Sequence, residues 1–185
     1  MKRLIMWNVV TLDGYFEGEK EWDLDFHRLV WGKELEDFIY EQLQSIDLLV
    51  FGAKTYQGMA DYWSNIPAES DDGKTAEYMN NLPKIVCSTK LDAANWNNTT
   101  IVRDAVAELS KLKQSGNGNI FVFGSGNLSE SLIKANLFDE YRLCIAPVFL
   151  GKGKHLFKEG LPYHKLTLLE ARQLQTGGVI LRYAS

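Results

Sequence analysis

Residues 120–128 read Ile-Phe-Val-Phe-Gly-Ser-Gly-Asn-Leu, and no other stretch restricts the fold of this chain as strongly. Four β-forming residues lead straight into Gly124-Ser125-Gly126, and an amphipathic helical pattern follows. This order predicts a strand, a tight turn and the start of a helix. Glycines let such a turn come close to a ligand, and the free N–H groups and dipole of a helix start favour an anion. An ordinary βα turn has the same pattern, so both interpretations stay open.

Strand-like runs and helical patterns alternate along the first 136 residues. The apolar, β-rich runs that predict strands are 4–10, 47–51, 85–88, 100–103 and 120–123. The patterns with apolar residues at helical spacing are 35–46, 55–62, 104–114 and 127–136. We expect exposed loops before residue 30 and over 64–73. The alternation predicts right-handed βαβ connections and a largely parallel sheet with helices on both faces.

The pattern changes after residue 140. Strand-like runs at 141–149, 166–173 and 179–183 have no helix between them, and Gly177-Gly178 predicts a hairpin between the last two. The expected fold class is therefore α/β, with a mostly parallel central sheet and antiparallel C-terminal strands. No linker or repeat interrupts the sequence, so we expect one domain over residues 1–185.

Composition narrows the classes of partner. With 45% hydrophobic residues the chain can bury a full core, and a net charge of −4 argues against binding nucleic acid through a broad positive surface. Cys87 and Cys144 each lie in an apolar run, which predicts buried free thiols in a reducing compartment and no metal site. The apolar run at the N-terminus ends too early for a signal peptide, and no segment approaches the roughly 18 apolar residues of a membrane span. We expect a cytoplasmic protein.

Small, hydroxylated or basic residues follow four of the predicted strands. These turns are Thr11-Leu-Asp13-Gly14, Gly52-Ala-Lys54-Thr55, Ser88-Thr89-Lys90 and Gly124-Ser-Gly126-Asn127. The carboxyl ends of parallel strands meet at one edge of a sheet, where ligands of open α/β sheets bind. Backbone N–H, hydroxyl and ammonium groups are donors that hold phosphates. Each turn alone could equally be a helix cap or solvated charge.

In their order and spacing the turns resemble the dihydrofolate reductase family, particularly stand-alone proteins similar to the C-terminal reductase domain of bifunctional riboflavin-biosynthesis enzymes. The resemblance covers nearly the whole chain. It rests on Thr11-Leu-Asp-Gly-Tyr15, Gly52-Ala-Lys-Thr-Tyr56, Ser88-Thr89, Gly124-Ser-Gly-Asn-Leu128, Asp139-Glu-Tyr-Arg-Leu143, Pro147-Val-Phe-Leu-Gly151 and Gly153. It implies a three-layer sandwich and an NADPH-dependent reductase that transfers hydride to a C=N or C=O bond of a small planar heterocycle, pyrimidine-like or pterin-like.

The resemblance also implies roles for individual residues. The cofactor residues would be Val9 and Phe16 beside the nicotinamide, Gly124, Ser125, Gly126, Asn127 and Leu128 at the pyrophosphate, and Gly52, Lys54, Thr55, Ser88, Thr89 and Lys90 at the adenosine side and its 2′-phosphate. The substrate residues would be Asn8, Trp22, Phe26 and His27. Asp13, or a water that it orders, would deliver the proton, although Asp-Gly is also a common turn.

Two positions depart from the family pattern. Ala53 stands where the family usually has Arg, so a bidentate phosphate donor is missing and the preference for NADPH over NADH stays open. Folate reductases carry a carboxylate five residues after the loop tryptophan, whereas here His27 follows Trp22 at that spacing. A pterin reductase with the usual acid is therefore not expected. The loop aromatics could also simply anchor their own segment.

No motif of a zinc deaminase partner is present, so the riboflavin step itself is less expected than another reduction. Two other classes of function stay open. One is a nucleotide-binding or flavin-binding module without turnover. The other is a purely structural homodimer built on residues 141–150. We expect a homodimer in either case, because no predicted helix covers the apolar C-terminal runs.

Overall fold

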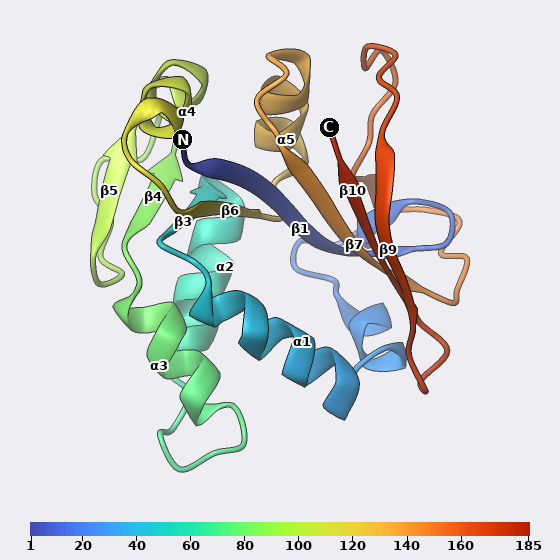
Figure 1. Ribbon diagram of the computed structural model, residues 1–185. Coiled ribbons are helices and arrows are strands. Elements are labelled where there is room, and N and C mark those ends of the chain that lie inside the picture. The colour runs from blue at the N-terminus through green and yellow to red at the C-terminus, as the bar shows by residue number, and fades with distance from the viewer.

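An eight-stranded sheet forms the middle layer of the computed structural model, which describes residues 1–185 (Figure 1). In sheet order its strands are β5 (Thr99–Val102), β4 (Lys84–Cys87), β3 (Leu48–Gly52), β6 (Asn119–Phe123), β1 (Arg3–Thr11), β7 (Glu140–Ala146), β10 (Val179–Ala184) and β9 (Thr167–Gln173). Strands β5 to β7 are parallel, whereas β10 is antiparallel to both of its neighbours. The predicted mostly parallel sheet with an antiparallel C-terminal end is confirmed.

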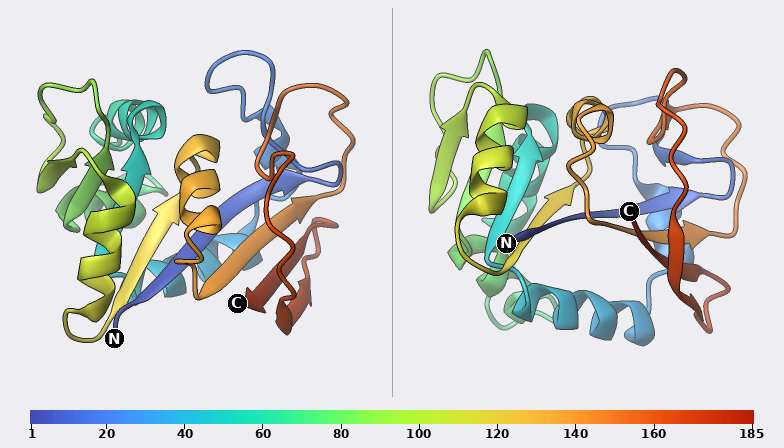
Figure 2. Two further views of the ribbon diagram at one scale, coloured as in Figure 1. Left: turned by 90° about the horizontal axis from the view of Figure 1, so that it is seen from above. Right: turned by 45° about the horizontal axis from the view of Figure 1, so that its top comes forward.

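Five helices cover the two faces of the sheet and complete a three-layer sandwich (Figure 2). One face carries α1 (Lys33–Gln44), α2 (Ala53–Trp63) and α3 (Gly73–Asn81), and the other carries α4 (Ala105–Gln114) and α5 (Gly126–Lys134). None of these helices is long and apolar enough to cross a membrane.

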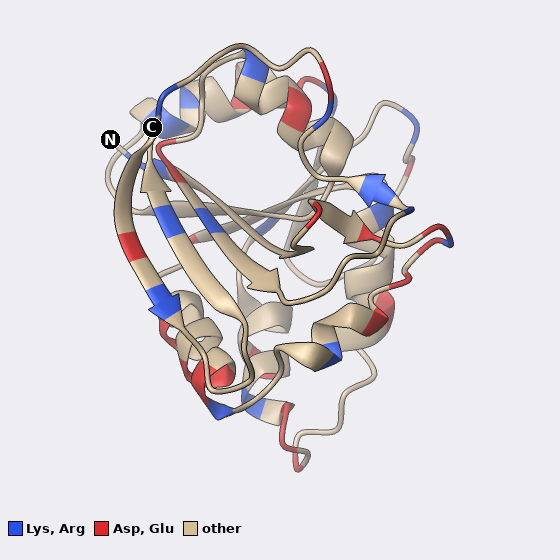
Figure 3. Cartoon of the chain, turned by 90° about the vertical axis from the view of Figure 1, so that its right-hand side faces the viewer, with Lys and Arg blue, Asp and Glu red and all other residues tan.

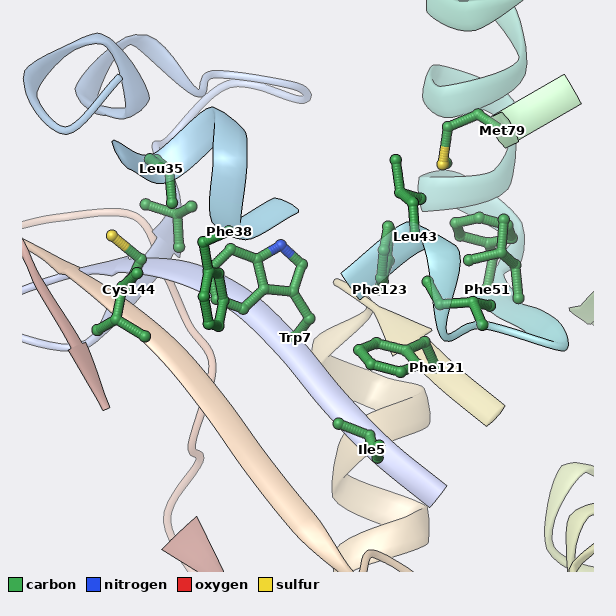
Figure 4. Close-up of a cluster of buried hydrophobic side chains, with 14 of the residues drawn as sticks. Ile5, Trp7, Leu35, Phe38, Leu43, Phe51, Met79, Phe121, Phe123 and Cys144 are labelled. Carbon is green, nitrogen blue, oxygen red and sulfur yellow. The ribbon is translucent and has the colours of Figure 1, made fainter. Parts of the chain in front are cut away.

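The two faces of β1 belong to two separate cores. Ile5 and Trp7 pack on the α1 side, whereas Leu4 and Met6 pack on the α4–α5 side. A strand buried on both faces must be apolar at successive positions, which explains its unbroken apolar run. Figure 4 shows the α1 side, where the rings of Trp7 and Phe38 lie 5.4 Å apart. This packing fixes α1 beneath the carboxyl half of β1.

Several elements differ from the prediction. Helix α3 was not predicted, because it begins with Gly73, ends in two asparagines and is held mainly by buried Ala76 and Met79. The predicted strand 141–149 ends at Ala146, since Pro147 has no N–H to continue a ladder. The strand β2 (Tyr15–Glu17) and a 3-10 helix, η1 (Asp25–Leu29), lie in a segment predicted as a loop. Strand β2 pairs with β8 (Lys154–His155), for which no strand was predicted.

The C-terminal end of the sheet is better covered than the sequence indicates. Strand β7 pairs on both edges, and its Cys144 and Ile180 of β10 are buried in the core that Val30 also joins. A dimer that pairs strand edges through residues 141–150 is therefore not compatible with this fold. The outermost strand is β9, and charged residues of both signs lie along this side of the molecule (Figure 3).

Cys87 and Cys144 are both free, as expected, although only Cys144 is fully buried. Burial raises the pKa of each thiol to about 12. Both groups are therefore neutral at physiological pH and are poor nucleophiles.

Candidate functional site

A cleft of 1940 Å³ opens at the carboxyl ends of the parallel strands. Its walls include Asn8 and Val9 of β1 and the residues that follow β3, β4, β5 and β6. From β1 the chain moves outward to β5, returns to β6 and then crosses over β1 to β7. The cleft therefore lies where the direction of strand order reverses, which is the usual ligand site of an open α/β sheet.

Strands β1 and β6 separate at the floor of the cleft. Their pairing ends at Trp7 and Phe123, whereas β1 continues to pair with β7 as far as Thr11. One edge of residues 8–11 therefore has no neighbouring strand. A flat ligand that enters there can meet main-chain groups that no sheet partner occupies.

The turn between β6 and α5 is locked to the turn between β3 and α2. Ser125, in a left-handed conformation with φ of 60°, accepts a hydrogen bond from the Gly52 amide at 2.8 Å and lies 2.9 Å from the Thr55 hydroxyl. A Cβ atom on Gly52 would come within 2.4 Å of the Ser125 Oγ, so only glycine fits there. The predicted pyrophosphate and adenosine turns are thus held together as one unit.

The N-terminus of α5 faces this cleft without a side-chain cap. Its dipole and first N–H groups favour an anion. Lys158 contributes a positive charge beside it, because its ammonium group contacts Asn127 and lies 3.0 Å from Glu130. Phe16 lies over the helix start, 3.2 Å from where a Gly126 Cβ would be. Lys158 was not predicted, since it is far from the turn in sequence.

A second basic group stands at the far end of the cleft. Arg103 directly follows β5, lines the cleft, and donates a hydrogen bond to the Ser88 carbonyl at 2.7 Å. Thr89 and Lys90 are exposed on the neighbouring turn. The Ser88 hydroxyl accepts hydrogen bonds from its own turn, at 3.2 Å from the Lys90 amide. The sequence predicts Arg103 as the last residue of a strand over 100–103, whereas β5 ends at Val102 and leaves Arg103 in the turn.

The segment from β2 to η1 crosses the cleft and touches α2. The ring of Trp22 lies against Gly58, where an added Cβ atom would come within 2.4 Å of it. Glu21 pairs with Lys54 at 3.2 Å, both side chains being mostly exposed. Phe26 is 6% exposed, belongs to the core and does not line the cleft. The prediction that Phe26 touches substrate is not supported, and the alternative of an anchoring aromatic describes it better.

Two buried polar atoms in the cleft wall have no hydrogen-bond partner, namely Asn8 Nδ2 and His27 Nε2. Asn8 is only 6% exposed. Burial lowers the pKa of His27 to about 4, so its imidazole is neutral at pH 7. Unpaired buried polar groups are costly, and each of these can be satisfied by a ligand.

Asp13 holds the 147–151 loop through hydrogen bonds and does not face the cleft, in contrast to the predicted role as proton donor. Its carboxylate accepts hydrogen bonds from the Thr11 hydroxyl at 2.6 Å and from the Leu150 and Gly151 amides, and it does not line the cleft. Desolvation alone would raise its pKa, but these hydrogen bonds outweigh it and lower the pKa to about 2. A group that is ionised and turned toward the 147–151 loop is a poor proton donor. The prediction of Asp13 as catalytic acid is corrected on this ground.

The cleft holds another carboxylate that sequence reasoning missed. Glu36 of α1 lines the wall together with Asp37 and Tyr40, and it makes no ion pair. It stands five residues after Trp31, which also lines the cleft. This is the tryptophan-to-acid spacing of folate reductases, whereas at the same distance from Trp22 the chain has His27. The other predicted residues, apart from Asp13 and Phe26, all line this one cleft.

Comparison with known proteins gives one family and one fold. The model of the family described as RibD C-terminal domain matches residues 2–180. The uncharacterized protein YyaP of Bacillus subtilis (strain 168) is 30% identical over 189 residues, covering 98% of this chain and 94% of that protein. A putative riboflavin biosynthesis protein from Shewanella sp. PV-4 superimposes with a TM-score of 0.79 at 19% identity, covering 98% of each chain. Dihydrofolate reductase from Enterococcus faecalis, complexed with NADP(H), gives a TM-score of 0.63 at 16% identity, covering 98% of this chain and 95% of that one.

Proposed function

The chain belongs to the RibD C-terminal domain family, and on this basis we propose that it is an NADPH-dependent reductase. The reaction would transfer hydride to a C=N or C=O bond of a small planar heterocycle, pyrimidine-like or pterin-like. One observation carries the proposal. A single cleft joins an anion-binding end, at the uncapped N-terminus of α5, to an aromatic half beneath the loop of Trp22, and the two meet where β1 and β6 separate.

NADPH would lie along the strand ends, and its nicotinamide would supply the hydride. The N-terminus of α5 and Lys158 would hold the pyrophosphate. Lys54, Lys90 and Arg103 would hold the 2′-phosphate. Arg103 thereby offers a planar guanidinium in place of the arginine that Ala53 replaces, which favours NADPH over NADH. Val9 and Phe16 would border the nicotinamide.

Reduction also needs a proton, and we assign its delivery to Glu36, directly or through a water. Glu36 lines the wall of the aromatic half and makes no ion pair. Asn8 and His27 would orient the heterocycle through their unpaired nitrogens. The protein would thus contribute position and a proton, while excluding water with the Trp22 loop.

A titration with NADPH and NADH, followed by thermal shift, tests cofactor binding. A ligand bound only by the native state adds about 2.7 kcal/mol of stability at a hundredfold excess over Kd. Absence of a shift with both nucleotides contradicts the proposal. NADPH binding without its consumption, across a panel of imines and carbonyl compounds, would instead support the binding module.

Cofactor preference gives a sharper test. Arg103→Ala should weaken the binding of NADPH about 10-fold to 100-fold, which corresponds to the loss of one charge-assisted hydrogen bond. The affinity for NADH should stay unchanged. Lys111→Ala is a matched control, because Lys111 is an exposed basic residue of α4 that does not line the cleft. An unchanged NADPH-to-NADH ratio in Arg103→Ala removes that residue from the phosphate site.

We also propose a homodimer through β9. This strand pairs only with β10, and its Leu168 and Leu169 are 53% and 49% exposed. An unpaired edge with exposed leucines is a template for a second strand, and two-fold symmetry is the commonest arrangement. Light scattering at micromolar concentration should give twice the 21.0 kDa of one chain, and Leu168→Glu should restore the single mass.

A further inference from the structure

The half of the cleft away from the β6–α5 turn, here called the substrate half, has flat aromatic walls. They come from the segment 18–31 and from helices α1 and α2. The aromatic side chains of these segments that line the cleft are Trp22, His27, Trp31, Tyr40, Tyr62 and Trp63. Such surfaces stack on planar ligands.

Charged residues around the substrate half are mostly acidic. Its carboxylates are Asp25, Glu36, Asp37, Asp71 and Asp72. Two of them already have a basic partner, because Arg28 pairs with Asp25 and Lys33 pairs with Asp37. Glu36, Asp71 and Asp72 have none, and Lys74 is the one basic residue here without an ion pair. Free negative charge therefore exceeds free positive charge in this half.

The two ends of the cleft differ in what they offer a phosphate. The cofactor end has an uncapped helix start together with Lys90 and Arg103, which make no ion pair, and Lys158, which pairs with Glu130. In the substrate half, Lys33 is held by Asp37, and Arg28, the only arginine there, lies 3.6 Å from Asp25. A phosphate carries close to two negative charges at pH 7 and needs several strong donors. A phosphate would find few such donors in the substrate half, and the carboxylates there would repel it.

The buried polar groups of the substrate half that have no hydrogen-bond partner are uncharged. Asn8 Nδ2 is a buried donor without an acceptor, at the point where β1 leaves β6. His27 Nε2 is buried and unpaired beneath the loop, on an imidazole that is neutral at pH 7. A carbonyl oxygen and a ring nitrogen or N–H are the partners that such groups accept. These are the edges of a neutral heterocycle.

We propose that the substrate is an uncharged planar heterocycle with a carbonyl-bearing edge, and that it carries no phosphate. The inference rests on the proposed reductase function, because it takes the cofactor to occupy the α5 end. The heterocycle stacks on the aromatic walls, its edge engages Asn8 and His27, and its substituent points toward the carboxylates.

Matched pairs of compounds that differ only by a phosphate test this class. The protein is first saturated with NADP⁺, which fills the anion-binding end and prevents turnover. Riboflavin against FMN, and uridine against uridine 5′-monophosphate, are then titrated by fluorescence and calorimetry. The unphosphorylated member of at least one pair should bind about tenfold or more tightly than its phosphate ester. Equal or tighter binding of FMN and the nucleotide overturns the proposal, as does absence of binding by all four.

Charge variants test whether the carboxylates of the substrate half cause the preference for the unphosphorylated compound. Asp71→Lys should narrow the preference for riboflavin over FMN, or for uridine over its phosphate, by about threefold or more. Asp92→Lys is the control, since Asp92 is exposed and does not line the cleft. Equal ratios in the two variants overturn the electrostatic basis. Because NADP⁺ saturation is measured first, failure of the cofactor site is separated from failure of this inference.

Discussion

The buried carboxylate of Glu140 contributes a free energy of unfolding that can be derived directly from its ion pairs and its lowered pKa. Its side chain is completely buried at the start of β7, and it accepts hydrogen bonds from Arg3 at 2.5 Å and from Arg142 and Arg182 at 2.7 Å each. These bonds join β1, β7 and β10, the strands that connect the parallel sheet to its antiparallel end. Desolvation would raise the pKa of Glu140, but the arginines outweigh it and lower the pKa to about 2.

Glu140→Gln keeps the shape of the side chain and removes its charge. The pKa falls from 4.5 to about 2, and at 1.36 kcal/mol per pKa unit this makes the ionised group worth about 3 kcal/mol at pH 7. Breaking a buried ion pair typically costs a similar ~3–5 kcal/mol, because Arg142 is left buried without a counter-charge. We expect the variant to lose about 3 kcal/mol of unfolding free energy.

Urea unfolding at pH 7 and pH 3 is the assay. Because the pKa of Glu140 is lower in the folded state, its contribution is complete above the ordinary value of 4.5 and is lost as the pH falls toward 2. The difference between wild type and variant should therefore shrink to about 1.4 kcal/mol at pH 3.

Glu170→Gln is the matched control, since Glu170 pairs with Arg172 and Arg182 on the partly exposed edge strand. Such a pair is worth about 1 kcal/mol or less. A Glu140→Gln deficit that is no larger than that of the control, or that stays constant between pH 7 and pH 3, would refute the reasoning.

Three further substitutions test individual contacts. Asp13→Asn should lower the melting temperature, because the Leu150 and Gly151 amides lose a charged acceptor, while the pH dependence of turnover stays the same; a changed pH profile would return Asp13 to the catalytic machinery. Gly58→Ala should displace Trp22 and raise the susceptibility of the 18–24 segment to proteolysis, even though alanine favours a helix by about 1 kcal/mol; unaltered tryptophan fluorescence and cleavage contradict this. Ser125→Ala should cost about 1–3 kcal/mol of stability, because it leaves the Gly52 amide unpaired, and it should weaken the binding of NADPH. Urea unfolding measures the stability and nucleotide titration measures the affinity. If neither changes, this bond does not lock the two turns.

The predictable part of the site was its backbone. Turns after strands can be identified from glycine and hydroxylated residues, and the order of alternating elements places those turns at one edge. Val9, Lys54, Ser88 and Gly124 accordingly line one cleft. Their roles toward NADPH stay a prediction.

The direction of individual side chains was not predictable. Asp13 follows β1 as expected, yet it binds amides 137 and 138 residues away. Phe26 lies in the loop over the cleft, yet it points into the core. Glu36 had a recognisable spacing from Trp31, but two tryptophans in one loop left the register ambiguous.

The sequence by itself determined the alternation of the main sheet strands with α1, α2, α4 and α5, the parallel sheet with its C-terminal hairpin, and the position of the strand–turn–helix unit at 120–128. These follow from the period of apolar residues and from local backbone preferences, which act over a few residues. The tertiary structure alone decided that Ser125 holds the Gly52 amide across 73 residues, that Glu140 gathers three arginines, and that Glu36 rather than Asp13 faces the cleft. Such pairings depend on how the elements pack, because side chains that meet in space carry no fixed separation along the chain.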